Sequence, residues 1–183
     1  MFDLTGKVVL LTGATGGIGK SIAKKMKEKG AKLILSGTKQ NILNELSSEL
    51  GNDTKAIATD LTSKESILSL ATEAESSFGH IDILINNAGI TADNLFLRMK
   101  DEEWDNVIKV NLSASMRLTR QVIKGMIKRK SGRIIFISSI VGFTGNPGQA
   151  NYSASKSALS GLTKSIALAV SYTHLRAHET TVY

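Results

Sequence analysis

The chain has 183 residues, enough for one domain with a substantial core, and its 42% apolar content argues against disorder. It contains no Cys, which excludes disulfides, thiolate nucleophiles and Cys-based metal sites. No apolar run approaches the roughly 18 residues of a membrane span, and residues 1–7 lack a signal-peptide pattern. We therefore predict a cytoplasmic protein with no membrane partner.

The net charge of +7 favours acidic or phosphate-bearing partners without identifying them. Part of this charge is concentrated in one stretch, called here the basic cluster. No aromatic residues interleave with it, so nucleic-acid binding is not predicted. Two interpretations stay open: a solvated helix end that places cations near its negative pole, or a docking patch for an acidic partner. The basic cluster comprises Lys124, Lys128, Arg129, Lys130 and Arg133.

Short apolar runs alternate with helical patterns along the chain. This alternation predicts an α/β fold of the Rossmann-like, doubly wound type, in which right-handed crossovers join parallel strands and helices cover both faces. No repeat or linker divides the chain, so residues 1–169 are expected to form one domain. Strands are predicted at residues 7–12, 31–36, 55–59, 81–86 and 133–138. Helices are predicted from the turn at 13–19 to residue 29, at 41–50, 63–78 and 101–128, and through residue 152 to about 170.

A glycine-rich turn follows the first predicted strand and opens the first helix. Gly13, Gly17 and Gly19 permit a tight turn and a close approach of the backbone to a pyrophosphate. The helix N-terminus adds unpaired N–H groups and a positive dipole end. Such a turn is a weak signal by itself, but within a βαβ unit it predicts a dinucleotide site.

The ends of the next strands indicate which dinucleotide binds. An acid after the second strand would bind the 2′-hydroxyl of NAD, and residues 35–39 contain none. Thr38 can hydrogen-bond a 2′-phosphate and Lys39 can neutralise it, which favours NADP; alternatively, Lys39 merely begins the next helix in solvent. Asp60, after the third strand, is placed for the adenine edge. Small residues at 86–89, after the fourth, let a ribose approach.

Three polar side chains follow the fifth predicted strand. Tyr152 and Lys156 are four residues apart and share a helix face, opposite the hydroxyl of Ser139 at the strand end. Together they supply an acid, a charge that tunes it and a donor for a developing oxyanion. A Tyr four residues before a Lys is common, and a Ser after a strand is usually a turn residue. The combination points to catalysis because a nucleotide site is predicted upstream.

With these motifs, residues 1–169 resemble the short-chain dehydrogenase/reductase family. The resemblance rests on the glycine turn, Asp60, residues 86–89, Asn111, Ser139, Tyr152 and Lys156. Segments 89–95, 98–104 and 145–152 are similar to the branch of the family that reduces 3-oxoacyl thioesters on acyl carrier protein in fatty-acid synthesis. The resemblance implies NADP(H) binding by Gly13, Thr15, Gly17, Ile18, Gly19, Thr38, Asp60, Leu61, Asn87, Ala88, Gly89, Tyr152 and Lys156.

The same resemblance implies a role for each catalytic residue. Tyr152 would protonate the ketone oxygen, and Lys156 would favour the ionised phenol and hold the nicotinamide ribose. Ser139 would donate to the carbonyl as its oxygen gains charge. Asn111 would support a water-linked proton path from Lys156; from the residues alone it is only a helix residue.

The resemblance also implies partners. It predicts a homotetramer and an acidic acyl carrier protein that docks on Lys128 and Arg129 of the basic cluster. Two other functions stay open: a related reductase acting on another small ketone or alcohol, and an NADP-binding fragment without turnover.

The resemblance ends at about Ala169, and we expect residues 170–183 to be a divergent or foreign tail. No strand is predicted there, so the strand at 133–138 is expected to be an exposed sheet edge, with the C-terminal strands of the family missing. Turnover is expected to be weak, because the nicotinamide side would lack its cover. His174 and His178 are four apart, but no third or fourth ligand is evident, so no metal site is predicted.

Overall fold

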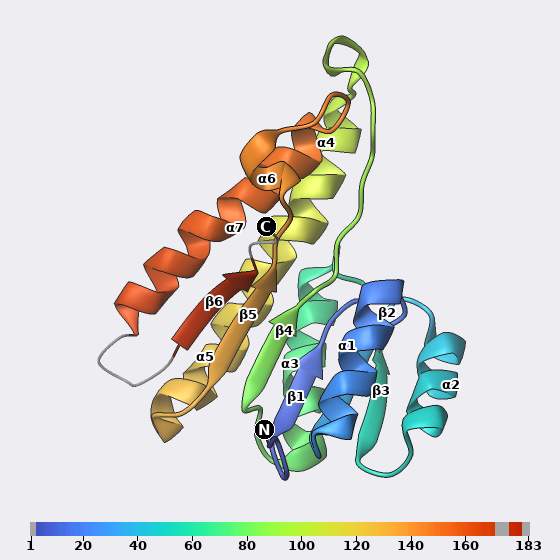
Figure 1. The fold of residues 1–183 in the computed structure, drawn as a ribbon, viewed down its shortest axis with the longest axis vertical. Coiled ribbons are helices and arrows are strands. Elements are labelled where there is room, and N and C mark those ends of the chain that lie inside the picture. The colour runs from blue at the N-terminus through green and yellow to red at the C-terminus, as the bar shows by residue number, and fades with distance from the viewer. Residues whose placement is uncertain (1–2, 171–175, 181–183) are drawn as a thin grey trace.

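A single parallel sheet organises the chain, with strand order β3-β2-β1-β4-β5-β6 (Figure 1). The computed structural model describes residues 3–170 and the backbone of 176–180. Each pair of neighbouring strands is parallel, as the alternating pattern predicts. The strands are β1 (Val8–Leu11), β2 (Lys32–Gly37), β3 (Thr54–Ala58), β4 (Ile83–Asn86), β5 (Arg133–Ile137) and β6 (Arg176–Thr180).

Helices join the strands and form a layer on each face of the sheet (Figure 1). On one face, Ala23 and Leu43 belong to one core cluster. On the other face, Ile67, Leu118 and Leu159 belong to a second cluster. The first two side chains come from α1 and α2, and the other three come from α3, α5 and α7. The helices are α1 (Gly17–Glu28), α2 (Gln40–Leu50), α3 (Lys64–Phe78), α4 (Asp101–Ile108), α5 (Ser115–Arg129), α6 (Val141–Thr144) and α7 (Ala150–Ala169), with a 3₁₀ turn η1 (Phe96–Arg98).

The sheet continues beyond β5, so one expectation from the sequence is wrong. Strand β6 pairs with β5 along its whole length, with Arg133 opposite Arg176 and Ile137 opposite Thr180. Strand β5 is therefore an inner strand with neighbours on both sides. The tail was not expected to contain a strand because its residues show no apolar run. Strand β6 forms through backbone pairing with β5, which a local sequence pattern does not reveal.

The single helix predicted at 101–128 is interrupted at its centre. Between α4 and α5 lies a π-helical segment, η2 (Lys109–Ala114), which contains Asn111. At its end, the hydroxyl of Ser115 donates to the carbonyl of Asn111 at 3.1 Å. Such π segments occur frequently at functional sites. Hydrophobic periodicity could not predict this one, because a single wide turn scarcely changes the pattern.

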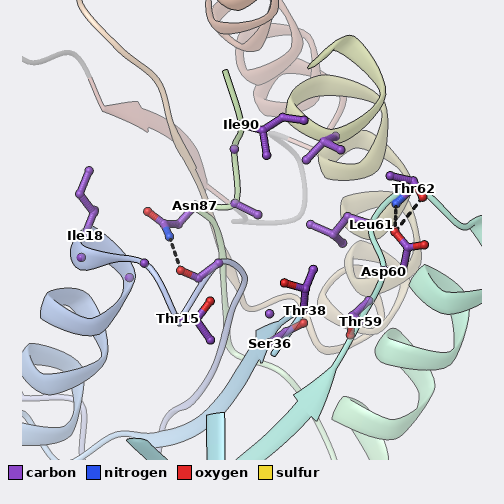
Figure 2. Close-up of a pocket in the computed structure, with 18 of the residues that line it drawn as sticks. Thr15, Ile18, Ser36, Thr38, Thr59, Asp60, Leu61, Thr62, Asn87 and Ile90 are labelled. Carbon is purple, nitrogen blue, oxygen red and sulfur yellow. Dashed lines mark hydrogen bonds between the residues drawn. The ribbon is translucent and has the colours of Figure 1, made fainter. Parts of the chain in front are cut away.

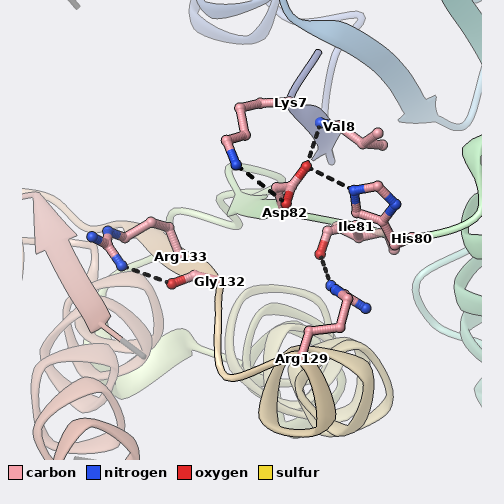
Figure 3. A network of polar contacts seen from close by, with 8 residues as sticks. All are labelled: Lys7, Val8, His80, Ile81, Asp82, Arg129, Gly132 and Arg133. Carbon is pink, nitrogen blue, oxygen red and sulfur yellow. Dashed lines mark hydrogen bonds and ion pairs between the residues drawn. The ribbon is translucent and has the colours of Figure 1, made fainter. Parts of the chain in front are cut away.

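A polar network closes the amino end of the sheet (Figure 3). Asp82 is buried, and its carboxylate accepts the N–H of Val8 at 2.9 Å and lies 3.1 Å from Nε2 of His80 and 3.8 Å from Nζ of Lys7. Nη2 of Arg129, at the end of α5, donates to the carbonyl of Ile81 at 2.7 Å. The network therefore joins β1, β4 and α5 at the end of the sheet opposite the carboxyl ends of the strands.

We expect Asp82→Ala to lower the free energy of unfolding by about 1–3 kcal/mol, because the buried N–H of Val8 loses its acceptor. Urea denaturation of both proteins measures the change. The control is Glu28→Ala, which removes an exposed carboxylate paired with Lys25 at 2.7 Å and should leave stability unchanged. Equal midpoints for Asp82→Ala and the unsubstituted protein would contradict a stabilising role for this network.

Candidate cofactor and catalytic site

A cleft of about 510 Å³ lies at the carboxyl ends of β1 to β4 (Figure 2). This is the position where ligands bind in open α/β sheets. Several lining residues were not singled out by the sequence, including Ser36, Thr59, Thr62, Ile90 and Val110. The cleft also brings together every cofactor-binding residue predicted outside α7: Gly13, Thr15, Gly17, Ile18, Gly19, Thr38, Asp60, Leu61, Asn87, Ala88 and Gly89.

The three predicted glycines have three different environments. Gly13 has φ +66°, and a Cβ there would lie 2.8 Å from the Cα of Ala88. A Cβ on Gly19 would lie 2.1 Å from the carbonyl oxygen of Gly13, so the start of α1 packs directly on the turn. Gly17 is different, since a Cβ there would meet no atom within 4 Å. Packing requires glycine at Gly13 and Gly19. Gly17 instead leaves the helix N-terminus open to a ligand.

Thr12, for which no site role was predicted, is hydrogen-bonded to two residues that line the cleft. Its buried hydroxyl accepts the N–H groups of Asn87 and Ala88, both at 3.1 Å. In return, the side-chain amide of Asn87 donates to the carbonyls of Thr12 and Gly13, at 3.0 and 3.2 Å. These bonds join the ends of β1 and β4. One sequence signal could have indicated this role, because Thr12 is a hydroxyl residue at the last position of the strand predicted at residues 7–12.

Two residues predicted to contact the adenosine half lie at the ends of β2 and β3. Thr38 is exposed and lines the cleft, and Lys39 after it is exposed at the N-terminus of α2. The carboxylate of Asp60 accepts the hydroxyl and the N–H of Thr62, at 2.7 and 2.8 Å. These two bonds lower the pKa of Asp60 below its ordinary value. Asp60 therefore stays ionised and oriented at the rim of the cleft.

Lys156 lies on α7, beside the cleft residue Gly89. It is 4% exposed, and its Nζ donates to the carbonyl of Ile137, the last residue of β5, at 2.7 Å. The same Nζ lies 5.6 Å from the centre of the Tyr152 ring. Burial lowers the pKa of Lys156 to about 8. The predicted pair of phenol and ammonium on one helix face is therefore present, with the ammonium anchored to the sheet.

Asn111 reaches the same point from the π segment. Its amide donates to the carbonyl of Ile90 at 3.0 Å, and its Oδ1 accepts the N–H of Ile90 at 2.8 Å. A Cβ built on Gly89 would lie 3.4 Å from Nζ of Lys156 and 3.5 Å from Oδ1 of Asn111. Both polar groups therefore face Gly89, which also lines the cleft. Two of the predicted catalytic residues, Lys156 and Asn111, therefore adjoin the predicted cofactor-binding residue Gly89.

Ser139 is brought to α7 by a short helix that the sequence did not predict. Its Oγ accepts the N–H of Val141 at 3.3 Å, and α6 begins there. A Cβ on Gly142 would lie 2.9 Å from the N of Ser157 and 3.0 Å from the carbonyl carbon of Lys156. Glycine at this position therefore lets α6 rest on the backbone of α7, which sets Ser139 close to the turn that carries Lys156.

Comparison with known proteins identifies the family. A family model described as short chain dehydrogenase matches residues 7–181. The chain belongs to the short chain dehydrogenase family. Its members are oxidoreductases that use nicotinamide cofactors, and the open glycine turn of the cleft fits such a group. The match extends past Ala169 and covers β6.

Curated relatives share nearly half of the matched sequence. "Nodulation protein G" of Rhizobium sp. (strain N33) is 48% identical over 167 residues, which is 91% of this chain and 68% of that protein. "3-oxoacyl-[acyl-carrier-protein] reductase FabG" of Vibrio cholerae serotype O1 is 47% identical over 165 residues, 90% of this chain and 68% of the relative. The protein of the same name from Escherichia coli (strain K12) has the same identity and coverage.

Two further observations concern metal and membrane binding. Among residues 3–170, no cluster of three or more His, Asp or Glu side chains is arranged to hold a metal ion. His174 and His178, the pair considered from the sequence, lie outside the side chains that the structure describes. Within the described helices, none is long and apolar enough to cross a bilayer.

Proposed function

We propose that this chain is an NADPH-dependent reductase of 3-oxoacyl thioesters, which it converts to 3-hydroxyacyl thioesters. The observation that carries the proposal is that Lys156 and Asn111 meet at Gly89, a residue of the cofactor cleft. The relatives named as 3-oxoacyl-[acyl-carrier-protein] reductases, at 47% identity, support the substrate class.

Each side chain has a distinct part in the proposed reaction. Bound in the cleft, the reduced nicotinamide supplies the hydride. The phenol of Tyr152 donates a proton to the ketone oxygen, and the nearby ammonium of Lys156 favours the phenolate that this leaves. Ser139 donates a hydrogen bond to the same oxygen as negative charge develops on it. Asn111 holds Ile90 and faces Lys156 across Gly89, where a water could return the proton.

The proposed preference for NADPH comes from the end of β2. Residues 36–40 include no carboxylate that would repel a 2′-phosphate. Thr38 lines the cleft, and the ammonium of Lys39 is exposed beside the N-terminus of α2. A hydroxyl, a cation and a helix N-terminus together suit a phosphate monoester.

The proposed carrier of the substrate is acyl carrier protein, and the basic cluster is the proposed contact. Arg133 is at the first position of β5 and Ile137 at the last, about 13 Å further along the strand, and Ser139 comes two residues after Ile137. The guanidinium of Arg129 is also bonded to the backbone at that end. Within one chain the basic cluster is therefore remote from the cleft, and carrier docking rests on charge complementarity.

The function is tested by following NADPH absorbance with acetoacetyl thioesters, simple ketones and sugars, and by repeating the assay with NADH. We expect kcat/KM to be at least about tenfold higher for the thioester than for the other ketones and for NADPH than for NADH. With a carrier-bound thioester, turnover should fall steeply as salt is added, whereas a small thioester should respond little.

Three outcomes would contradict separate parts of the proposal. Preferential turnover of a sugar or another small ketone would reassign the substrate. Preference for NADH would reassign the cofactor and remove the role of Lys39. An identical salt response for the carrier-bound and small thioesters would exclude docking through the basic cluster.

A further inference from the structure

A fully buried amide side chain, Asn151, directly precedes Tyr152 and joins three parts of the site. Its Nδ2 donates to the carbonyl of Ala92 at 2.9 Å and to the carbonyl of Glu103 at 3.4 Å. Its Oδ1 accepts the N–H of Tyr152 at 2.7 Å. The side chain is 0% exposed. One amide therefore connects the first turn of α7 to α4 and to the segment that follows β4.

A second buried link holds the other side of the same turn. The hydroxyl of Ser155 donates to the carbonyl of Tyr152 at 2.7 Å and accepts from Nδ2 of Asn111 at 3.1 Å. Asn111 is in turn bonded to both backbone groups of Ile90. The backbone N–H and C=O of Tyr152 are thus both bonded to buried side chains, which lead back to Ile90 and Ala92.

The segment held by these two links begins in the cofactor cleft. Residues 87–90 line the cleft, and Ala92 lies two residues further on. Another bond between the same two parts of the chain joins Gln149 to Asp93 at 2.9 Å, but that pair is exposed to water. A buried amide with its donors and acceptor used fixes geometry more strictly than an exposed pair. The buried bonds therefore couple residues 87–90 of the cleft to the first turn of α7, which carries Tyr152.

We propose that Asn151 is a positioning residue that fixes the Tyr152 phenol relative to the cofactor cleft. The side-chain amide of Asn151 joins the first turn of α7, which carries Tyr152, to Ala92 and α4. The phenol of Tyr152 is thereby held where it can meet a substrate that the cleft positions. Misplacement of a reacting group by about 1 Å costs about 100-fold in rate. The inference rests on the proposed role of Tyr152 as proton donor. The three hydrogen bonds of Asn151 are present whether or not Tyr152 has that role.

The test compares two substitutions of Asn151 in the full chain. Asn151→Ala removes all three bonds. Asn151→Asp keeps an acceptor for the N–H of Tyr152 but loses the donors and sets a carboxylate against two carbonyls. We expect kcat to fall about 100-fold in both variants, while the Kd for NADPH changes by less than about twofold.

Two controls separate positioning from general stability. Gln149→Ala removes the exposed bond between the same segments, and we expect its kcat to be unchanged. Asp82→Ala destabilises the opposite end of the sheet, and it should lower the unfolding midpoint without lowering kcat at a temperature where it is folded. A kcat for Asn151→Ala equal to that of Gln149→Ala would overturn the proposal. A parallel loss of NADPH affinity would also overturn it, because the cleft itself would then have changed.

The emission of Trp104 provides a readout that needs no turnover. Trp104 is the only Trp of the chain and follows Glu103, whose carbonyl accepts from Asn151. We expect its emission or its quenching by acrylamide to change in Asn151→Ala and not in Gln149→Ala. If the unsubstituted chain reduces no ketone, the proposed function fails, and this comparison still decides whether Asn151 holds the turn. Identical emission and quenching in the unsubstituted chain, Asn151→Ala and Gln149→Ala would reject the link from Asn151 to α4.

Discussion

Tyr152→Phe is expected to lower the turnover of ketone substrates by about 10²- to 10⁴-fold, the range that one positioned proton donor contributes. The substitution deletes one oxygen from a half-buried ring and leaves the backbone bonds of Tyr152 to Asn151 and Ser155 in place. The cleft residues do not change, so NADPH should bind with its affinity unaltered. Steady-state assays and a titration of cofactor fluorescence measure the two quantities.

The contrast between the two measurements is what makes this prediction informative. Ser157→Ala is the matched control, because it removes an exposed hydroxyl from the same helix and should alter neither quantity. Loss of NADPH binding in Tyr152→Phe would indicate that the ring shapes the cleft. A rate that is near zero in the unsubstituted chain and insensitive to the substitution would favour nucleotide binding without catalysis.

Lys156→Met is expected to lower turnover by at least about 100-fold, because the phenol loses its neighbouring charge and the site loses a hydrogen-bond donor. It should also change how stability depends on pH. In the folded chain, burial lowers the pKa of Lys156 from 10.5 to about 8. Between these two values the unfolded chain binds a proton that the folded chain does not.

The direction of the stability change follows from this difference in bound protons. Where the unfolded state binds more protons, the free energy of unfolding rises with pH. The contribution of Lys156 is therefore fully present above pH 10.5 and is lost as the pH falls through about 8. The pKa change corresponds to about 3 kcal/mol. We expect the unsubstituted chain to gain about this much over Lys156→Met across the window.

Urea unfolding of both proteins below pH 8 and above pH 10.5 measures this difference. Lys164→Met is the control, since Lys164 is an exposed lysine of the same helix. It should give neither the loss of rate nor the pH-dependent difference. A constant difference between the unsubstituted chain and Lys156→Met across the window would show that Lys156 titrates with its ordinary pKa.

Much of the fold follows from local signals. The apolar runs predicted five parallel strands to within two residues. The carboxyl ends of those strands meet at one edge, so the residues after them were expected to share a site, and a cleft does bring them together. Tyr152 and Lys156 lie on one helix face because the period of the α-helix requires it.

Other features depend on contacts between distant segments. Strand β6 pairs with β5 despite having no apolar pattern of its own. The side chain of Asn111, in the π-helical segment, donates to the carbonyl of Ile90, which lies 21 residues earlier in the chain. A carrier protein was expected to dock on the basic cluster, but the direction of β5 separates Arg133 of this cluster from Ser139.

The sequence by itself determined the strand and helix order, the glycine turn and the chemical groups of the site, because these depend on periodicity and on residue type. Only the tertiary structure decided that Lys156 is bonded to the end of β5, that Asn111 and Lys156 meet at Gly89, and that Asn151 holds the catalytic turn. The physical reason is that a buried polar group must find its partner within the folded core, and that partner can be far away in the chain.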